Sequence, residues 1–351
     1  MNPIVPEDGR EERLRALREE AAAKGTVRAT GIRPLASPMP AASPETGYYG
    51  QPLLKEPQWT PLVPLYFFVG GATGSLGVIG ALADLLGGDQ ELARKARGLA
   101  LAGTGLSTAL LIADLGKPSR FLNMLRVFKP HSPMSVGSWV LSGFGASAAA
   151  SSLADLLESD AGANGFASFL RGAGRTGCVL FGMPLHNYTG VLIGASVIPA
   201  WNNRIRSLPR EFGMSGLQSA VSLLELSGEL DHPALNVLGL VSAAFESWEG
   251  IDLLRTKARE LRPAKSGWSG LLVHLAGTLS GPVPIALRVA SWFVKDGKRL
   301  RRMAALSGIA GSLLMRYGWV HAGTVSSRDW KVPLNIEEGT DGEREPGIVV
   351  R

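Results

Sequence analysis

The chain has 351 residues, 45% of them hydrophobic and 19% charged, and carries a formal net charge of +6 at pH 7. Its basic residues gather in short loops between long apolar blocks, a pattern typical of a membrane protein rather than of one that binds nucleic acid. The single cysteine, Cys178, excludes an internal disulfide and any zinc or iron–sulfur site built from several thiolates of this chain. The 44 glycines suit membrane helices that pack closely.

The chain begins and ends with polar segments. Residues 1–60 contain a charged stretch at 7–24, which predicts a short helix, and a stretch rich in Pro, Gly and Ser at 26–64, which predicts an extended tether. Residues 324–351 are acidic and punctuated by proline and glycine. We expect each tail either to dock on a partner subunit or to stay disordered, and we assign residues 61–323 to one membrane domain.

The central region predicts about eight transmembrane helices, each close to the ~20 residues that cross a hydrocarbon core. The segments are 63–86, 98–115, 136–157, 174–200, 213–228, 234–254, 268–294 and 304–322. The fifth segment is the weakest, because Glu225 interrupts it and its apolar stretch is short. A β-barrel would need alternation with a period of two, which the sequence lacks. The predicted fold class is therefore all-α, a polytopic helical membrane bundle.

Residues 114–139, DLGKPSRFLNMLRVFKPHSPMSVGSW, join the second and third segments. A connector of about 20 residues is long for a compact domain unless it has a function. It contains cations and prolines in close succession, namely Lys117, Pro118, Arg120, Arg126, Lys129, Pro130 and Pro133. We expect it to form a small ordered lid at the membrane surface.

This connector closely resembles the one that marks the NrfD/PsrC family, the quinone-interacting membrane subunits of modular redox complexes. Its core, Asp-Leu-Gly-basic-Pro-x-Arg-Phe-Leu, is followed at the matching distance by Ser-Pro-Met-Ser and Gly-Ser-Trp. Three further stretches resemble the family in the same order: the opening helix at 59–71, the motif Pro-Leu-x-x-Tyr-Thr-Gly at 184–190, and the arginine-containing run at 313–317. The departures are His186, where a small residue is expected, and the long N-terminal tail.

The resemblance implies an eight-helix subunit without haem or an iron–sulfur cluster of its own. It would exchange electrons between a membrane quinone, menaquinone or ubiquinone, and a ferredoxin-like iron–sulfur subunit. Beyond that partner, the resemblance implies a molybdopterin or multihaem cytochrome subunit. We therefore expect a subunit of a respiratory oxidoreductase in the bacterial inner membrane, not a complete enzyme, with no catalytic or metal-binding residues of its own.

The resemblance also implies a quinone site beneath the connector, between the first and fourth helices. Tyr188 corresponds to the tyrosine that borders the quinone in the family, and a phenol can donate a hydrogen bond to a quinone carbonyl. Tyr66 with Gly70 offers an aromatic wall beside a face without side chains. The predicted site residues are Tyr66, Gly70 and Tyr188, with Asp114, Lys117, Arg120 and His131 closing the mouth. The alternative is structural: interfacial anchoring by Tyr66, close packing at the glycine, and an interhelical hydrogen bond from Tyr188.

Three acids of the sixth segment, Glu246, Glu249 and Asp252, are spaced i, i+3 and i+6 and form one stripe. Like charges in a low dielectric cannot all stay ionised, so at least one is expected to hold a proton at neutral pH, as a proton relay requires. Glu225 and His186 could extend the relay. The alternative is that Asp252 and Glu249 lie at the aqueous helix end and pair with a following arginine, Arg255.

Arg316 lies within apolar sequence, so it is expected to pair with an acid or with backbone carbonyls inside the bundle. Asp114 is a candidate partner for it or for Arg120. The dense basic loop at 295–302 favours the cytoplasmic side, which places both termini and the connector on the extracytoplasmic face. The loop at 255–265 is also basic and argues for the opposite orientation.

Two other classes of protein remain open. A di-haem cytochrome b anchor needs paired axial histidines, and the embedded histidines, His186, His274 and His321, occur in no paired motif. A secondary transporter or proton channel without a redox partner could use the acid stripe and Arg316. It would commonly show symmetry between its halves, which is not visible here.

Overall fold

The computed structural model describes residues 53–87, 89–115, 117–161, 165–329 and 331–333, and five positions near the N-terminus, 15, 16, 19, 20 and 23. The chain divides into two units, Met1–Gln51 and Pro52–Arg351. The five described positions of the first unit are helical and exposed. Most of the predicted tails at 1–60 and 324–351 lies outside the described residues, so everything below concerns the second unit.

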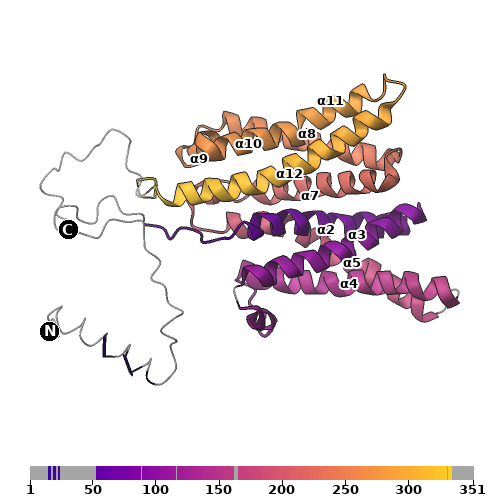
Figure 1. The fold of residues 1–351 in the computed structure, drawn as a ribbon, viewed down its shortest axis with the longest axis horizontal. Helices are drawn as coiled ribbons and strands as arrows, with labels where there is room; N and C mark the ends of the chain where they lie inside the picture. The colour runs from indigo at the N-terminus through magenta and orange to yellow at the C-terminus, as the bar shows by residue number, and fades with distance from the viewer. Residues whose placement is uncertain are drawn as a thin grey trace, which may run out of the picture. The chain divides into compact units, whose positions relative to one another are not determined.

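The described part of this unit is all-helical and contains no strand, which confirms the predicted all-α class (Figure 1). The long helices are joined by short turns, and one 3-10 helix, η1, fills the connector. In chain order the elements are α2 (Leu62–Leu85), α3 (Gln90–Asp114), η1 (Pro118–Leu125), α4 (Pro133–Ala161), α5 (Gly165–Gly194), α6 (Pro199–Asn202), α7 (Leu208–Leu224), η2 (Glu225–Glu229), α8 (Pro233–Arg255), η3 (Arg259–Leu261), α9 (Arg262–Lys265), α10 (Gly267–Ser280), α11 (Pro282–Ala290) and α12 (Gly297–Ser327).

Each of the eight predicted segments overlaps a helix of the structure. Among the described residues, four stretches are long and apolar enough to cross a membrane: Leu62–Leu85, Gln90–Asp114, Pro133–Leu157 and Gly267–Ala290. The last runs across α10 and α11. Helix α7 has 17 residues and is the shortest of the predicted spans, in line with the weakness of its sequence signal. A bundle with several membrane spans is therefore shown, whereas the count of eight stays a prediction.

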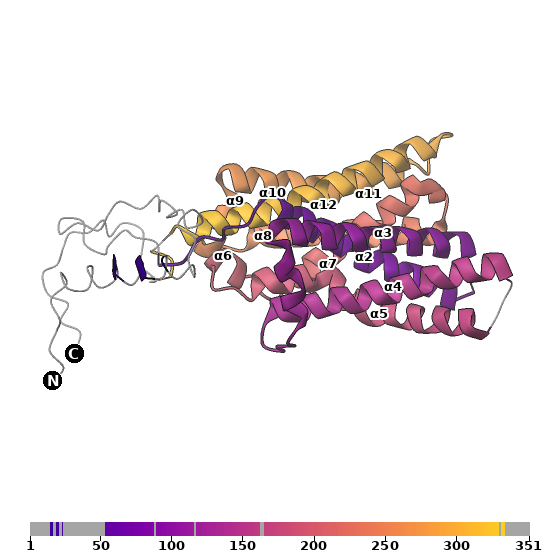
Figure 2. The same ribbon diagram turned by 60° about the horizontal axis from the view of Figure 1, so that its bottom comes forward.

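Consecutive long helices run in opposite directions, so the bundle has two distinct ends (Figure 2). The connector end holds the start of α2 and the ends of α3 and α12. There Thr60 Oγ1 donates to Asp114 Oδ1 at 2.6 Å, and the Tyr317 hydroxyl donates to the Pro61 carbonyl at 2.9 Å. The far end holds the opposite turns, where Lys95 Nζ lies 2.5 Å from Glu229 Oε1. The predicted quinone residues of α2 and of the connector belong to the connector end.

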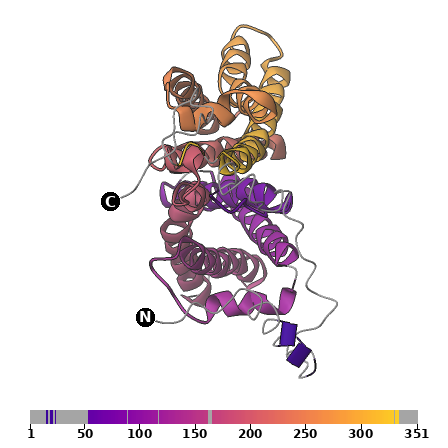
Figure 3. The same cartoon turned by 90° about the vertical axis from the view of Figure 1, so that its left-hand side faces the viewer.

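Helix α2 lies at the centre, and it contacts α3, α5, α7 and α12. Figure 3 shows the indigo and purple helices between the magenta pair α4–α5 and the orange and yellow C-terminal helices. Glycines permit the closest approaches: a Cβ on Gly74 would lie 2.8 Å from the Gly182 carbonyl of α5, and one on Gly216 would lie 2.8 Å from the Gly71 carbonyl. Small residues thus let α5 and α7 pack closely against α2 at neighbouring glycines, Gly74 and Gly71.

The outward faces of the long helices are apolar. Large exposed hydrophobic side chains occur on most of them and include Leu106, Leu156, Phe169, Leu180, Val237, Trp248, Leu271 and Trp292. A soluble protein would rarely expose so much contiguous apolar surface, whereas lipid solvates it without penalty.

Candidate functional site

The connector forms the first part of the candidate site. Lys117 precedes η1 as its N-cap residue, and Pro118 starts the helix. The Lys117, Arg120 and His131 side chains are exposed. Asp114 binds Thr60 and so joins the end of α3 to the segment before α2. Arg316 is bound by Phe212, Ser215 and Ser312 instead of Asp114, and no ion pair joins Asp114 to Arg120 among the described residues.

The three residues predicted to border the quinone come together at this end of the bundle. Tyr66 of α2 and Tyr188 of α5 are both buried and lie within electrostatic range of each other. A Cβ on Gly70 would lie 3.5 Å from Tyr66 Cε2, so the ring covers this glycine. The Tyr188 ring fills a notch at Gly137 of α4, where a Cβ would overlap it. Tyr66 and Tyr188 thus lie where α2, α4 and α5 meet, and this place is called the quinone slot below.

Gly137 is a residue whose role the sequence did not reveal. It belongs to the Gly-Ser-Trp end of the connector motif, which marked the family resemblance without assigning any contact to the glycine. A substitution there would displace the phenol ring of Tyr188. The signal that could have found it is a glycine in the first turns of a helix that follows a functional connector.

His186 points to a different part of the molecule from Tyr188. Its Nε2 lies 3.0 Å from the position of a Cβ on Gly213 of α7, and it lines a cavity of about 220 Å³ with Arg210 and Phe245. The two residues on α5 therefore have separate surroundings, because positions two apart on a helix face different neighbours.

The acid stripe of α8 divides into an ion-paired part and a deeper part. Glu249 is buried, and its Oε2 accepts from Arg204 Nη2 at 2.5 Å. Asp252 has a side chain that is 50% exposed, and it accepts from Arg204 Nη1 at 3.0 Å. The partner of both acids is thus Arg204, from the turn between α6 and α7, and not Arg255.

Glu246 lies deeper in the bundle. Its Oε2 accepts from Ser280 Oγ of α10 at 3.2 Å, whereas Oε1 has no hydrogen-bond partner in the described part of the chain. Both Arg316 of α12 and Glu211 of α7 are near enough to act on it electrostatically. A buried carboxyl group with one free oxygen can hold and pass a proton.

Arg316 is fully buried and is held mainly by oxygen atoms of α7 and α12. It donates to the carbonyls of Phe212 at 2.9 Å and Ser312 at 3.1 Å, and to the hydroxyl of Ser215. Its guanidinium carbon lies 5.0 Å from the centre of the Phe212 ring. Of the two partners expected from the sequence, an acid or backbone carbonyls, Arg316 is thus bound mainly by carbonyls.

Glu211 is a buried acid that the sequence did not single out. It lies in the first turn of α7 and accepts from Trp319 Nε1 at 2.8 Å. The predicted fifth segment begins two residues later, at 213, and so leaves Glu211 outside it. Pro209 near the start of this helix, followed by an acid, is a helix N-terminal pattern that could have placed it inside α7.

Glu225 is fully buried and has a partner that the sequence did not show. Arg288 of α11, also fully buried, donates to Glu225 Oε1 at 2.5 Å and to Oε2 at 2.7 Å. Asn236 Oδ1 accepts a further bond from Arg288 at 3.3 Å. A lone arginine within the apolar seventh segment was the available signal.

A second ionic cluster joins α2, α3 and α4 at the far end. Arg97 donates to both carboxylate oxygens of Asp155, at 2.7 and 2.8 Å, and Asp84 Oδ2 lies 3.8 Å from Arg97 Nη1.

Within the described ranges, no group of three or more His, Cys, Asp or Glu side chains is arranged to hold a metal ion. The predicted absence of haem and iron–sulfur clusters stays a prediction.

The residues from just before α2 into η2 match a known protein family. Residues 55–227 match the family model described as polysulphide reductase NrfD. This segment belongs to the NrfD family. It contains all seven predicted quinone residues, so the resemblance seen in the motifs is confirmed. A search of curated proteins gives no significant match. With the candidate spans, the family match identifies an integral membrane protein.

Proposed function

We propose that this NrfD-family protein is the quinone-interacting membrane subunit of a multi-subunit oxidoreductase. It exchanges electrons between a membrane quinone and a ferredoxin-like iron–sulfur subunit, which in turn serves a molybdopterin or multihaem cytochrome subunit. The observation that carries this proposal is the meeting of Tyr66, Gly70 and Tyr188 at one end of the bundle, inside the segment that matches the family.

Reduction of a quinone to a quinol takes up two electrons and two protons, and oxidation releases them. In the proposed site the quinone head group lies between α2 and α5, with the Tyr188 hydroxyl donating a hydrogen bond to a carbonyl oxygen. The exposed Lys117, Arg120 and His131 of the connector favour partial negative charge at the mouth. The protein orients the substrate, and the partner subunit supplies or accepts the electrons.

We further propose that the bundle has eight spans in a bacterial inner membrane, with the connector end facing outward together with both termini. The basic turn at 295–302 lies at the far end and then faces the cytoplasm, in agreement with the positive-inside rule. On the outer side, the connector end would present the quinone slot to an iron–sulfur partner.

A proton-transfer role is proposed for the buried acids of the C-terminal helices. Glu246 is central to it because one of its oxygens is unpartnered in the described structure, while Glu211 and Arg316 lie near. Glu249 and Asp252 continue the line toward the connector end through Arg204. His186 borders the same cavity as Arg210, whose Nη2 lies 3.7 Å from Glu249 Oε1, so it could join this line there, whereas Glu225 is paired with Arg288 and would need a separate route.

The quinone assignment is tested by Tyr188→Phe in the purified complex. This change keeps the ring and removes one hydrogen bond, worth about 0.5–1.5 kcal/mol, so quinol turnover should fall by about tenfold or less. Tyr317→Phe is the matched control, because its hydroxyl binds the Pro61 carbonyl outside the slot. Equal turnover and quinone affinity in Tyr188→Phe and wild type would remove Tyr188 from the site.

Partner identity is tested by purification from native membranes. An iron–sulfur subunit should copurify in constant ratio, and its loss should abolish quinol oxidation. If the protein purifies alone and moves protons or solutes across liposomes without a redox partner, the transporter or channel function replaces the one proposed. The buried Glu246 and Arg316 would then form its transport path.

A further inference from the structure

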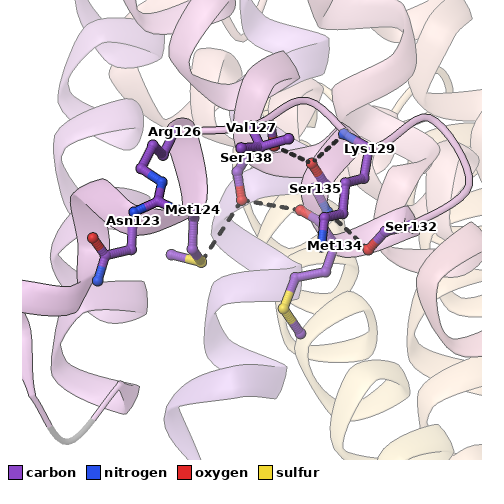
Figure 4. Close-up of a pocket in the computed structure, with 9 residues that line it drawn as sticks. All are labelled: Asn123, Met124, Arg126, Val127, Lys129, Ser132, Met134, Ser135 and Ser138. Carbon is purple, nitrogen blue, oxygen red and sulfur yellow. Dashed lines mark hydrogen bonds between the residues drawn. The ribbon is translucent and has the colours of Figure 1, made fainter.

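The connector contains a cavity that the proposed quinone slot does not use. It has a volume of about 450 Å³ and opens between η1 and the first turns of α4. Figure 4 shows Asn123 and Arg126 on one side of it and Lys129 and Ser132 on the other. None of the predicted quinone residues lines this cavity.

Hydrogen bonds of its walls hold the shape of the cavity. Ser135 Oγ accepts from the Lys129 backbone N–H at 3.0 Å and donates to the Val127 carbonyl at 3.3 Å. Ser138 Oγ donates to Met124 Sδ at 3.8 Å and so joins η1 to α4, as the dashed lines in Figure 4 show. The charged side chains at the rim take no part in these bonds, so they can be replaced without dismantling the walls.

The cavity is positively charged. Arg126 and Lys129 line it, and no carboxylate does. Both side chains are exposed, and neither forms an ion pair with a described residue. In contrast, the buried arginines Arg204 and Arg288 bind acids. An anion is the ligand that this arrangement favours.

The cavity also lies at the surface of the membrane. The connector joins α3 to α4, and both contain candidate spans. Phe128 and Trp139 beside the cavity are 53% and 42% exposed and pack edge to face with their ring centres 6.1 Å apart. Exposed aromatic residues of this kind are typical of the boundary between headgroups and acyl chains. Met134 of the cavity wall is likewise exposed.

We propose that this cavity binds the headgroup of an anionic phospholipid. The phosphate lies between Arg126 and Lys129, and the acyl chains run along Met134, Phe128 and Trp139. The two cations alone would suit any anion, but the exposed apolar rim suits only a ligand with hydrocarbon. A bound lipid would hold the connector in place above the bundle. This lipid site is separate from the quinone site, so lipid binding can be tested whether or not the quinone assignment is correct.

The test uses the full-length protein in phosphatidylcholine nanodiscs, titrated with phosphatidylglycerol and followed by native mass spectrometry of bound lipid. One phosphatidylglycerol should bind in preference to phosphatidylcholine. Each cation near a membrane surface contributes about fivefold, so R126A/K129A should weaken that binding about 30-fold. The charge-preserving R126K/K129R should retain most of the affinity. R206A/K257A removes the same charge from exposed positions at the same end and should bind like wild type.

Three results would overturn the proposal. Equal losses in R126A/K129A and R206A/K257A would show unspecific attraction to the membrane. Glycerol phosphate that binds as tightly as the lipid would show an anion site that does not need acyl chains. Displacement of the lipid by a synthetic peptide of residues 337–345, EEGTDGERE, at equal or lower concentration would identify an acidic protein segment as the occupant.

Discussion

Two buried acids in the C-terminal half of the bundle are held in very different ways. Glu225, near the far end, has both oxygens bound by the fully buried guanidinium of Arg288. Glu246, toward the connector end, accepts from Ser280 at 3.2 Å, with Ser215 also near enough to act on it, and its Oε1 has no hydrogen bond of good geometry among the described residues. Arg316, the nearest cation, uses its donors largely on carbonyls and hydroxyls of α7 and α12.

The difference separates a structural acid from one that is free to exchange a proton. A bidentate buried pair gains its stability only when both charges are present, so a proton on Glu225 would leave Arg288 uncompensated. Glu246 has no such bidentate partner: the Nη atoms of Arg316 donate to carbonyls and a hydroxyl of α7 and α12, and its Nε has no hydrogen-bond partner among the described residues. Burial alone therefore does not distinguish the two acids, and the incomplete pairing of Glu246 is the reason that we propose it, and not Glu225, for proton transfer.

The largest effect is expected from breaking the Glu225 pair. Arg288→Met leaves a buried carboxylate without a partner and should lower the free energy of unfolding by about 3–5 kcal/mol. The measurement is the midpoint of unfolding in detergent, followed by circular dichroism. The double variant E225Q/R288M leaves no unpaired charge and should recover most of the loss. If Arg288→Met is as stable as wild type, the pair does not have the structural role assigned here.

A smaller and different effect is expected at Glu246. Glu246→Gln keeps the shape of the side chain and its bond to Ser280 but cannot carry a proton. Removal of a positioned proton-transfer group slows the step it serves by about 10²-fold. Proton uptake coupled to quinone turnover, followed with a pH dye in proteoliposomes, should show that loss. Assembly with partner subunits and the unfolding midpoint should stay those of wild type. Full proton-coupled turnover in this variant would make the acid structural.

The smallest effect is expected from an ion pair at the surface. Asp231, in the turn before α8, lies 2.7 Å from Lys298 Nζ, and this hydrogen bond lowers the pKa of the carboxyl group below its ordinary value of 3.8. The stabilising contribution is present at pH values above 3.8 and is lost as the pH falls through the lower folded-state pKa. At pH 7, Asp231→Asn should change the unfolding midpoint by little, because both side chains are exposed.

The pH dependence of that variant completes the comparison. Wild type should lose its small advantage over Asp231→Asn only in acid, as the pH falls below 3.8. An advantage that persists at pH 2 would contradict the assignment of the Asp231 pair.

Helix positions followed from the sequence more closely than helix ends did. Helix α3 starts at Gln90, eight residues before the predicted span at 98–115. Its first turns are charged, and these charges are satisfied by Glu229 and Asp155 from other helices. Helix α12 likewise starts at Gly297 rather than at 304. Apolar length predicts what crosses the membrane, but a helix continues wherever its charged turns find partners or water.

The candidate quinone residues were predicted from motifs, whereas their proximity depends on how the helices pack. Tyr66 and Gly70 lie one turn apart on α2, so their proximity follows from helical spacing alone. The approach of Tyr188 depends on the crossing of α2 with α5 at Gly74 and Gly182, and on the notch at Gly137. Crossings of this kind depend on packing between distant segments, which a local pattern does not contain.

By itself, the sequence determined the all-helical membrane class and the family of residues 55–227, because apolar length and motif spacing are local properties. Only the tertiary structure decided which charges meet. Arg288 binds Glu225 across 63 positions of the chain, and Arg204 binds Glu249 across 45. Any buried acid of this bundle could have been paired by any buried arginine as far as the sequence shows. The choice was made by the crossing of the helices, which brings Arg288 to one carboxylate and Arg204 to two, and leaves one oxygen of Glu246 without a hydrogen-bond partner among the described residues.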